Sequence, residues 1–259
     1  MADKLSALVM GSGYAAQGHT EALRYCGVDV VGMVSRSEDV VRQVAAELAI
    51  PYVSTNWEQA LADTQASIVA IGTPGGAHFE AIMQAIAYKA HVFCDKPLAE
   101  TAEKARRLYE AAQSAGVKTA YAASYRYQPN VLYARQLIHE GYIGHPLEIE
   151  CISHFNLERL IPFGWSHRLE QGGGRLNNNF THKLSIVEHL LDGNPLQVIG
   201  AVRNDMDKAP LVSGVHHFRT RREFIPSEDE LASIEWGEVN AEWSYTVMAE
   251  LESPHAPKP

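Results

Sequence analysis

Apolar positions in the first half of the chain fall into short continuous runs, and each run is followed by a stretch of helical periodicity. Strands that are apolar on both faces and alternate with helices are typical of a parallel sheet with helices on both sides. The sequence therefore predicts an α/β, doubly wound arrangement at the start of the chain. The expected strands are 5–10, 28–34, 52–53, 67–72, 91–94 and 118–123, and the expected helices are 14–25, 38–48, 57–62, one that ends near 88, and one that Thr101 caps and Gly116 ends.

Beyond residue 122 the pattern changes to longer runs in which apolar and polar residues alternate. Alternation is typical of antiparallel strands with one face in water, so we expect an α+β second domain with a mostly antiparallel, open sheet. The expected division is a first domain at 1–122, a second domain at 123–252 and a disordered tail at 253–259. In the second domain the expected helices are about 130–140 and 179–191, and the expected strands are 147–155, 197–203, 215–224, 232–238 and 242–251.

The composition limits the classes of partner that the protein can bind and indicates its cellular compartment. The 259 residues carry a net charge of −9, which argues against a nucleic acid or an anionic membrane as partner because either would repel the molecule. We expect neither a signal peptide nor a membrane-spanning segment, because no apolar run has the required length. Three scattered cysteines are typical of reduced thiols, so the expected compartment is the cytoplasm.

The spacing of the twelve histidines gives no indication of a metal site. They do not show the local spacing of metal ligands, and the adjacent His216 and His217 would point to opposite faces of the strand expected there. No metal cofactor is therefore expected.

The stretch 5–19 (LSALVMGSGYAAQGH) joins a predicted strand to a predicted helix through two glycines. A turn of this kind points backbone N–H groups and the positive end of a helix dipole at one place, which suits a pyrophosphate. Gly11 allows the turn, Gly13 lets phosphate oxygens approach the backbone, and Ala16 is small where the helix passes the strand. Taken alone, the pattern also fits a glycine turn that serves packing only.

The residues after the second expected strand bear on the choice of dinucleotide. An acidic residue about 20 residues after the glycines is typical of NAD binding, because it contacts the ribose hydroxyls. This chain has Ser35 and Arg36 instead, and a guanidinium pairs well with a ribose 2′-phosphate, so NADP is expected in preference to NAD. The alternative is that Arg36 lies in solvent and that Glu38 or Asp39 binds the ribose of NAD.

Two further segments carry candidate catalytic groups. Lys96 in Asp95-Lys96-Pro97 follows a predicted strand, where its ammonium can polarise the oxygen of an alcohol or ketone while Asp95 holds the lysine. His182 starts a predicted helix, and an imidazole that titrates near neutral pH can transfer a proton. Asn178 lies on the same helical face and can orient His182 or a substrate hydroxyl. The alternatives are a surface Asp-Lys-Pro turn and a structural histidine.

Taken together, five segments resemble the Gfo/Idh/MocA oxidoreductase family, which is named for glucose–fructose oxidoreductase, inositol dehydrogenase and rhizopine catabolism. The resemblance covers residues 5 to about 203. It implies a Rossmann domain, a C-terminal α/β domain whose open sheet forms homo-oligomer contacts, and NAD(P)-dependent chemistry on sugars, cyclitols and related alcohols or ketones. The segments that carry it, in the order and spacing of the family, are 11–19, 73–85, 91–101, 125–130 and 172–193.

The resemblance also implies roles for individual positions. Lys96 and His182 match the family's catalytic lysine and histidine. Substrate contacts are expected from Lys96, Arg126, Trp165, Asn178 and His182. Cofactor contacts are expected from Gly11, Gly13, Tyr14, Ala15, Ala16, Ser35, Arg36, Thr73, Pro74, His78, Asp95 and Lys96.

The chain departs from the family pattern in three places. Asn178 and Ser185 stand where the family often has aspartate, and from about Asp205 onward the resemblance becomes faint, so we expect a shortened second domain. The leading hypothesis is NADP-dependent hydride transfer to or from a secondary alcohol or ketone of a small, polar, sugar-like or cyclitol-like substrate, in a homo-oligomer. The alternatives are a catalytically silent NAD(P)-binding sensor or partner subunit, and the same reaction on a cyclic ketone or an aromatic diol.

Overall fold

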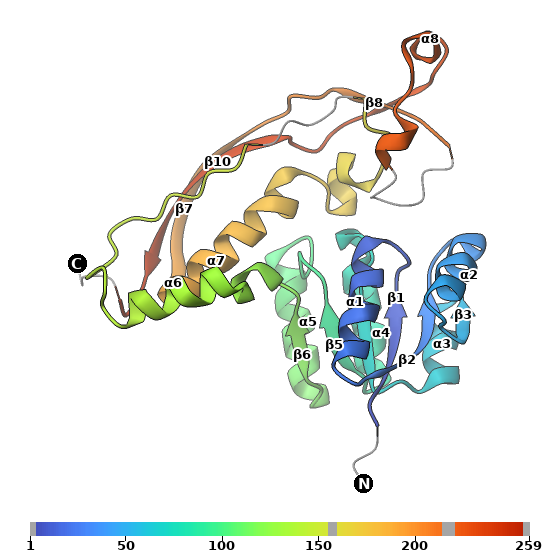
Figure 1. Ribbon diagram of the computed structural model, residues 1–259, viewed down its shortest axis with the longest axis horizontal. Coiled ribbons are helices and arrows are strands. Elements are labelled where there is room, and N and C mark those ends of the chain that lie inside the picture. Colours follow the sequence, from blue (N-terminus) through green and yellow to red (C-terminus); the bar gives the residue numbers. More distant parts are fainter. Residues whose placement is uncertain (1–3, 155–159, 214–220, 256–259) are drawn as a thin grey trace.

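The computed structural model describes residues 4–154, 160–213 and 221–255 (Figure 1). Its first half is a six-stranded parallel sheet with the strand order β3-β2-β1-β4-β5-β6, which confirms the predicted doubly wound arrangement. Each of the six expected strands is present. Their observed bounds are Ser6–Met10 (β1), Asp29–Val34 (β2), Tyr52–Ser54 (β3), Ile68–Ile71 (β4), His91–Cys94 (β5) and Thr119–Tyr121 (β6).

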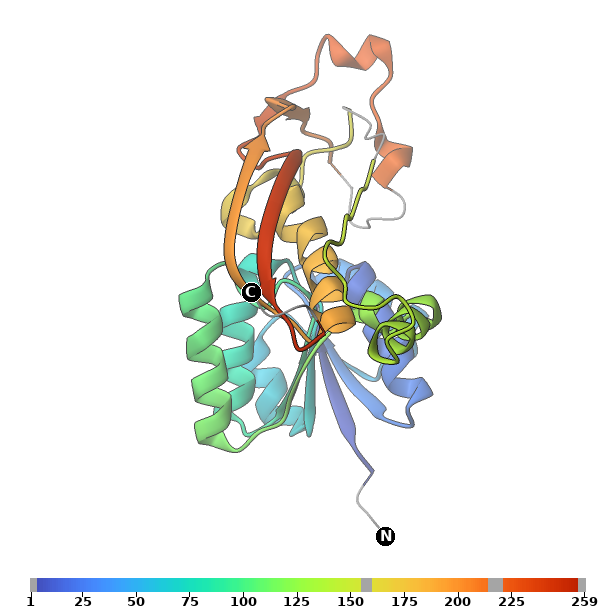
Figure 2. The same ribbon diagram turned by 90° about the vertical axis from the view of Figure 1, so that its left-hand side faces the viewer.

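Helices cover both faces of this sheet (Figure 2). They are Tyr14–Tyr25 (α1), Glu38–Glu47 (α2), Trp57–Thr64 (α3), His78–Ala87 (α4) and Ala102–Ala115 (α5). Helices α1 and α2 close one apolar core, and α3, α4 and α5 close another on the opposite face. Thr101 caps α5 by accepting a hydrogen bond from the Lys104 N–H, and Gly116 ends it with a left-handed φ of 69°, as predicted.

The described part of the second half contains the α-helices α6, α7 and α8, a long two-stranded ribbon and a smaller strand pair. Both strand pairs are antiparallel, as expected. The longer elements are Pro129–His139 (α6), Thr181–Leu191 (α7), Asn194–Arg203 (β7) and Ser244–Glu252 (β10). The shorter ones are Lys208–Pro210 (β8), Glu228–Leu231 (α8) and Trp236–Glu238 (β9). The domain boundary expected at residue 122 stays a prediction.

Two expected strands of the second half need correction, and a third lies largely outside the described residues. Residues 147–154 alternate like a strand, but within the described chain they pair with no other strand, and a strand requires a neighbour for its ladder hydrogen bonds. Of the strand expected at 232–238 only β9 forms, because the N–H groups of Ser233 and Ile234 continue the turn of α8 by donating to Glu230. The strand expected at 215–224 lies outside the described residues as far as 220, including His216 and His217, and 221–224 form a 3-10 turn without apolar alternation.

The tail that was expected to be disordered from residue 253 is ordered as far as His255. The Ser253 hydroxyl donates to the Leu191 carbonyl oxygen (2.5 Å), and the His255 N–H donates to the Ser253 hydroxyl (3.1 Å). His145 Nδ1 lies 3.0 Å from the His255 carbonyl oxygen. The segment after β10 is therefore tied to the end of α7, and 256–259 lie outside the described residues.

Two sequence expectations concern the surroundings of the protein. None of the described helices combines the length and the apolar character that a membrane crossing requires. The thiols of Cys26, Cys94 and Cys151 are free, as expected, although only Cys94 is buried. The cytoplasmic location stays a prediction.

Candidate active site

The glycine turn between β1 and α1 leaves room for a phosphate group. Gly11 has a φ of +113°, and a Cβ there would lie 2.7 Å from the Gly72 carbonyl oxygen, so only glycine fits. A Cβ at Gly13, the N-cap of α1, would meet no atom within 4 Å. The N-terminus of α1 therefore faces open space, and its N–H groups and dipole fit the pyrophosphate of a dinucleotide.

The first turn of α1 holds the other residues that the resemblance assigns to this part of the site. Ala16 is fully buried, and a Cβ at Gly72 would lie 2.5 Å from its backbone nitrogen. Helix and strand thus pass closely here, as the small residue predicts. Tyr14 is exposed and Ala15 half-buried, at the edge of the open space.

Alanine substitutions at the two glycines are expected to have different effects. Gly11→Ala forces its methyl group against Gly72 from a strained backbone, so the free energy of unfolding should fall by about 2 kcal/mol or more. Gly13→Ala has room and a φ of −78°, so it should keep its stability but weaken dinucleotide binding tenfold or more, a loss of about 1.4 kcal/mol. Urea unfolding and NADPH titration measure the two effects. Undiminished affinity in Gly13→Ala would contradict the phosphate site.

Ser35 and Arg36 lie beside this turn. The Ser12 hydroxyl donates to the Ser35 hydroxyl (2.9 Å), which joins the end of β2 to the glycine loop. Arg36 is exposed and forms no hydrogen bond or ion pair with the described residues. Glu38, one of the two acids considered as a ribose ligand, instead pairs with Arg42 (2.7 Å). The Arg36 guanidinium is therefore a charged group available at this strand end, and Asp39 is exposed there as well.

The loop after β4 leads into three residues that the resemblance assigns to the cofactor, Thr73, Pro74 and His78. Thr73 and Pro74 begin this loop, and the Thr73 hydroxyl is buried without a hydrogen-bond partner in the described structure. His78 is fully buried, and its two ring nitrogens contact the carbonyl oxygens of Thr73 (2.8 Å) and Pro97 (2.7 Å). His78 therefore joins the loop after β4 to the loop after β5. The cofactor contact that the resemblance implies for it stays a prediction.

Lys96 lies two residues after the end of β5, in a loop whose Lys96–Pro97 peptide bond is cis. Its Nζ donates to the side-chain oxygen of Asn178 (2.8 Å) and to the carbonyl oxygen of the same residue (3.2 Å). Burial and then the charge of Arg175 lower the pKa of Lys96, and Asp95 acts in the opposite direction. The fold thus brings together Lys96 and Asn178, two residues that are 82 positions apart.

His182 is the second residue of α7 and follows a π-helical turn, Leu176–Phe180, that contains Asn178. The Tyr125 ring stacks on its imidazole with centroids 4.2 Å apart and planes 16° apart. His182 Nδ1 is buried and has no hydrogen-bond partner in the described structure. Burial and then the charge of Lys96 lower the pKa of His182 to about 4. At neutral pH the site therefore holds a neutral imidazole with an unused nitrogen.

Arg126 lies against α7 one turn beyond His182. It belongs to the 3-10 turn Ser124–Tyr127, and its Nε donates to the Ser185 hydroxyl (2.8 Å). Burial raises the pKa of Glu188, and the charge of Arg126 opposes this shift. Arg126 thus contacts α7 through Ser185. Its expected contact with a substrate stays a prediction.

The consecutive glycines before α7 allow two loops to approach closely. Gly172 has a φ of +76°, and a Cβ there would lie 3.2 Å from the Cα of Gly75. A Cβ at Gly173 would lie 2.7 Å from the carbonyl oxygen of Trp165, which begins the 3-10 turn Trp165–His167. The segment that carries Trp165 and leads into α7 is therefore packed directly on the loop after β4.

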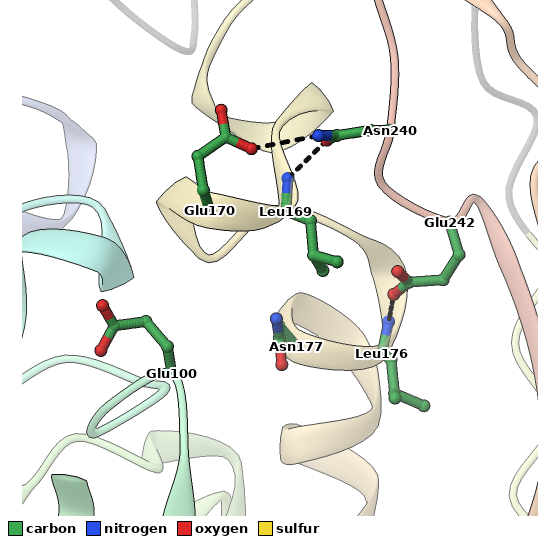
Figure 3. A pocket seen from close by; sticks show the side chains of 7 residues that line it. All are labelled: Glu100, Leu169, Glu170, Leu176, Asn177, Asn240 and Glu242. Carbon is green, nitrogen blue, oxygen red and sulfur yellow. Dashed lines mark hydrogen bonds between the residues drawn. The ribbon is translucent and has the colours of Figure 1, made fainter.

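A hollow of about 520 Å³ opens beside the π-helical turn (Figure 3). The Glu242 carboxylate accepts a hydrogen bond from the Leu176 N–H (2.7 Å) and so fixes the start of this turn. Neither Lys96 nor His182 lines the hollow, so it is separate from their cluster. Its lining residues are Glu100, Leu169, Glu170, Leu176, Asn177, Asn240 and Glu242.

Two residues of the cluster are not among the predicted site residues. Tyr125 stacks on His182, and Arg175, whose guanidinium lies 5.2 Å from the centre of the Trp243 ring, lowers the pKa of Lys96. Both belong to segments that carry the family resemblance, and an aromatic residue directly before Arg126 is a signal that could have pointed to Tyr125. Their partners follow only from the fold.

Comparisons with known proteins add to this picture. The family model described as "Oxidoreductase family, NAD-binding Rossmann fold" matches residues 5–123, and the GFO/IDH/MocA C-terminal domain matches residues 131–253. The 1,5-anhydro-D-fructose reductase of Ensifer adhaerens is 31% identical over 74% of this chain and 58% of that protein. The inositol 2-dehydrogenase/D-chiro-inositol 3-dehydrogenase of Shouchella clausii is 31% identical over 58% of this chain and 44% of its own. An NAD binding oxidoreductase from Klebsiella pneumoniae, 25% identical, matches with a TM-score of 0.76 over 98% of this chain and 65% of that one.

The fold and the open glycine turn define a dinucleotide-binding Rossmann protein. The chain belongs to the GFO/IDH/MocA family of oxidoreductases, as the motifs imply. The match to its C-terminal domain continues to residue 253, well beyond the point at which the motif resemblance becomes faint. The chain spans about half the length of the curated relatives that it matches.

Proposed function

We propose that the chain catalyses NADP-dependent hydride transfer to or from a CH–OH carbon of a small sugar-like or cyclitol-like substrate. The observation that carries this proposal is the half-buried Lys96 ammonium, held by Asn178 near the neutral imidazole of His182, whose buried Nδ1 has no hydrogen-bond partner in the described structure. Relatives named for a sugar and for a cyclitol support the substrate class. A silent sensor has no physical need for such a costly arrangement of buried polar groups.

Each group has one task in this proposal. Bound NADP(H) supplies or accepts the hydride. Lys96 donates a hydrogen bond to the substrate oxygen and stabilises the negative charge that develops there. His182 takes the hydroxyl proton when the alcohol is oxidised and returns it when the ketone is reduced. Asn178 holds the Lys96 ammonium, in the position where the family often has a carboxylate.

The end of β2 supports NADP as the cofactor. Arg36 is exposed and has no partner in the described structure, whereas Glu38 is paired with Arg42. A 2′-phosphate beside Ser35 could pair with the Arg36 guanidinium. Glu38 would not compete for that guanidinium, because it is paired with Arg42. NAD stays the alternative, because Asp39 is also exposed near this strand end.

Removing the Arg36 side chain tests the cofactor preference. Arg36→Ala should weaken NADPH binding tenfold or more, because a charge-assisted hydrogen bond contributes about 1.5–3 kcal/mol, and should leave NADH binding unchanged. Titration by nicotinamide fluorescence measures both affinities. Arg106→Ala, at an exposed arginine of α5, is the matched control and should bind both as the parent does. A parent that prefers NADH contradicts the proposal.

Turnover tests the reaction itself. The chain is mixed with NADPH and 1,5-anhydro-D-fructose, and separately with NADP⁺ and a panel of cyclitols and sugars, while nicotinamide absorbance is followed. We expect turnover with at least one member of the panel. Tight NADPH binding without turnover on any sugar, cyclitol, cyclic ketone or aromatic diol would instead support the silent sensor.

The ribbon of β7 and β10 supports self-association. Ile199 and Met248 are ladder partners, and their side chains are 72% and 73% exposed. An apolar face of this kind is stabilised when a second copy covers it. Light scattering should give a multiple of the monomer mass, and Ile199→Glu should shift the protein towards the monomer. A monomeric parent would contradict this part of the proposal. The expected compartment of the protein remains the cytoplasm.

A further inference from the structure

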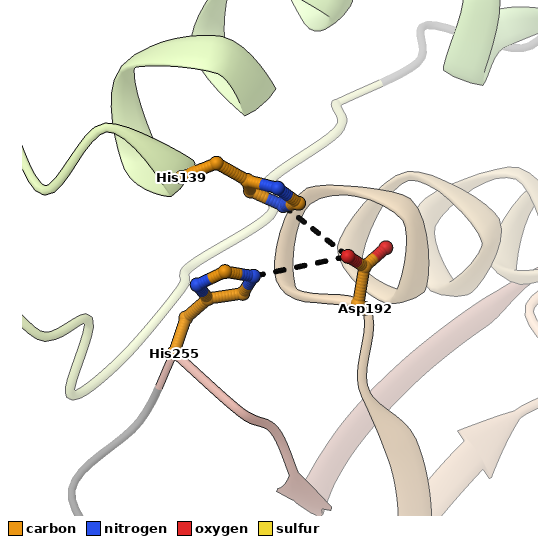
Figure 4. A group of neighbouring side chains, drawn as sticks. All are labelled: His139, Asp192 and His255. Atoms are coloured by element: carbon orange, nitrogen blue, oxygen red, sulfur yellow. Dashed lines mark ion pairs between the residues drawn. The ribbon is translucent and has the colours of Figure 1, made fainter.

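A cluster of two histidines and an aspartate lies at the opposite end of α7 from the candidate active site. His139 is the last residue of α6, Asp192 follows α7, and His255 lies in the turn after β10. Figure 4 shows both imidazoles directed at one carboxylate. One potential ligand atom from each residue lies within 4.8 Å of the other two. Three distant parts of the chain thus present a metal-ligand set at one point.

The separations within the cluster do not suit direct hydrogen bonds. Asp192 Oδ2 lies 3.5 Å from His139 Nε2 and 3.8 Å from His255 Nε2, whereas N–H···O hydrogen bonds span about 2.7–3.2 Å. Two ligands of a tetrahedral zinc ion, with bonds of about 2.0–2.1 Å, are about 3.3–3.4 Å apart. The two separations from Asp192 need only a small contraction to match that geometry.

The surrounding contacts orient the three residues towards one another. Arg135 donates to Asp192 Oδ1 (2.6 Å), so Oδ2 is the oxygen that faces the imidazoles. His139 Nε2 is buried and has no hydrogen-bond partner in the described structure. The backbone of His255 is held by the Ser253 hydroxyl (3.1 Å). Contacts that fix a ligand from its outer side are typical of metal sites.

We propose that His139, Asp192 and His255 bind one Zn²⁺, with water as a fourth ligand. Two imidazoles and one carboxylate are a donor set that zinc accepts. The ion would join the ends of α6 and α7 to the segment after β10. Along α7, His182 and Asp192 are separated by about 15 Å of helix rise, so the ion has a structural role and takes no part in hydride transfer. The expectation of no metal rested on local spacing, which a site built from three distant residues does not show.

Metal titration of the tag-free protein, after removal of bound metal by a chelator, tests the site. Calorimetry should show one Zn²⁺ per chain, Zn²⁺ should raise Tm, and Co²⁺ should give the visible absorption of a tetrahedral complex. His255→Ala and Asp192→Asn should each weaken Zn²⁺ binding by about 100-fold or more. Asparagine tolerates the left-handed backbone of Asp192 (φ 45°), so the second variant keeps the local fold.

The matched control is His154→Ala, which removes an exposed histidine outside the cluster. It should bind Zn²⁺ as the parent does. The proposal is overturned if the parent takes up no stoichiometric Zn²⁺, or if His255→Ala and Asp192→Asn bind it as tightly as the control. In that case the three residues form only a pH-dependent ion cluster that ties the segment after β10 to α7.

Discussion

Replacing Lys96 by methionine is expected to lower kcat/KM for hydride transfer by about 10³-fold. Methionine keeps an unbranched apolar side chain but removes the ammonium that donates to Asn178 and, as proposed, to the substrate oxygen. NADPH affinity should change by less than about tenfold, because the glycine turn and Arg36 are untouched. Steady-state kinetics and NADPH titration measure the two quantities separately.

A matched variant separates this effect from a general loss of positive charge. Lys118→Met replaces an exposed lysine next to the same sheet and should keep the parental rate. If Lys96→Met turns over as fast as Lys118→Met, Lys96 does not polarise the substrate oxygen. If instead its NADPH affinity falls in proportion to its rate, Lys96 is a cofactor contact alone.

The rate of alcohol oxidation is expected to stay near its maximum down to about pH 5. Burial and then the charge of Lys96 lower the pKa of His182 to about 4, and a proton acceptor must be neutral to act. At pH 5 about 90% of such imidazoles are neutral, compared with about 3% for an ordinary histidine. The acid limb of kcat/KM should therefore lie near pH 4. His182→Ala should abolish this limb and lower the rate by about 10²- to 10⁴-fold.

Asn178→Asp tests the electrostatic origin of this profile. A carboxylate next to Lys96 places negative charge near His182 and raises its pKa, so the acid limb should move to higher pH. His154→Ala, at an exposed histidine, should keep the parental profile. A parental limb near pH 6.5 contradicts the effect of burial, and an unchanged rate in His182→Ala contradicts its role as proton acceptor.

The parallel sheet could be predicted because its determinants are local. The residues 7–10 of β1 are all buried, and so are 69–71 of β4, so these strands appear in the sequence as unbroken apolar runs. The glycine turn is also recognisable from the sequence, because a strand-to-helix turn with a positive φ at residue 11 requires a glycine. For this half, pattern and fold agree closely.

The second half was harder to predict because its ladders depend on distant partners. Residues 147–154 and β7 both look like strands in the sequence. Among the described residues only β7 finds a partner, 41 or more positions further along in β10. Nothing local distinguishes the two segments. The ordered turn at His255 likewise depends on its contact with the end of α7 rather than on its own composition.

In the candidate site, too, local features could be predicted and features that depend on distant residues could not. Lys96 and His182 stand out because each lies in a recognisable local motif, and Asn178 lies in the same motif as His182. The direction of a side chain is not local, which is why the sequence did not show that His78 joins two loops. The stacking of Tyr125 on His182 and the cluster at Asp192 also appear only once the chain is folded.

The most direct measurement is a crystal structure of the protein with NADP⁺ and an alcohol substrate identified by turnover. The reacting hydroxyl is predicted to lie within hydrogen-bond distance of both Lys96 Nζ and a ring nitrogen of His182, with its carbon facing the nicotinamide. A pyrophosphate bound away from Gly13, or a reacting hydroxyl in contact with neither side chain, would contradict the account.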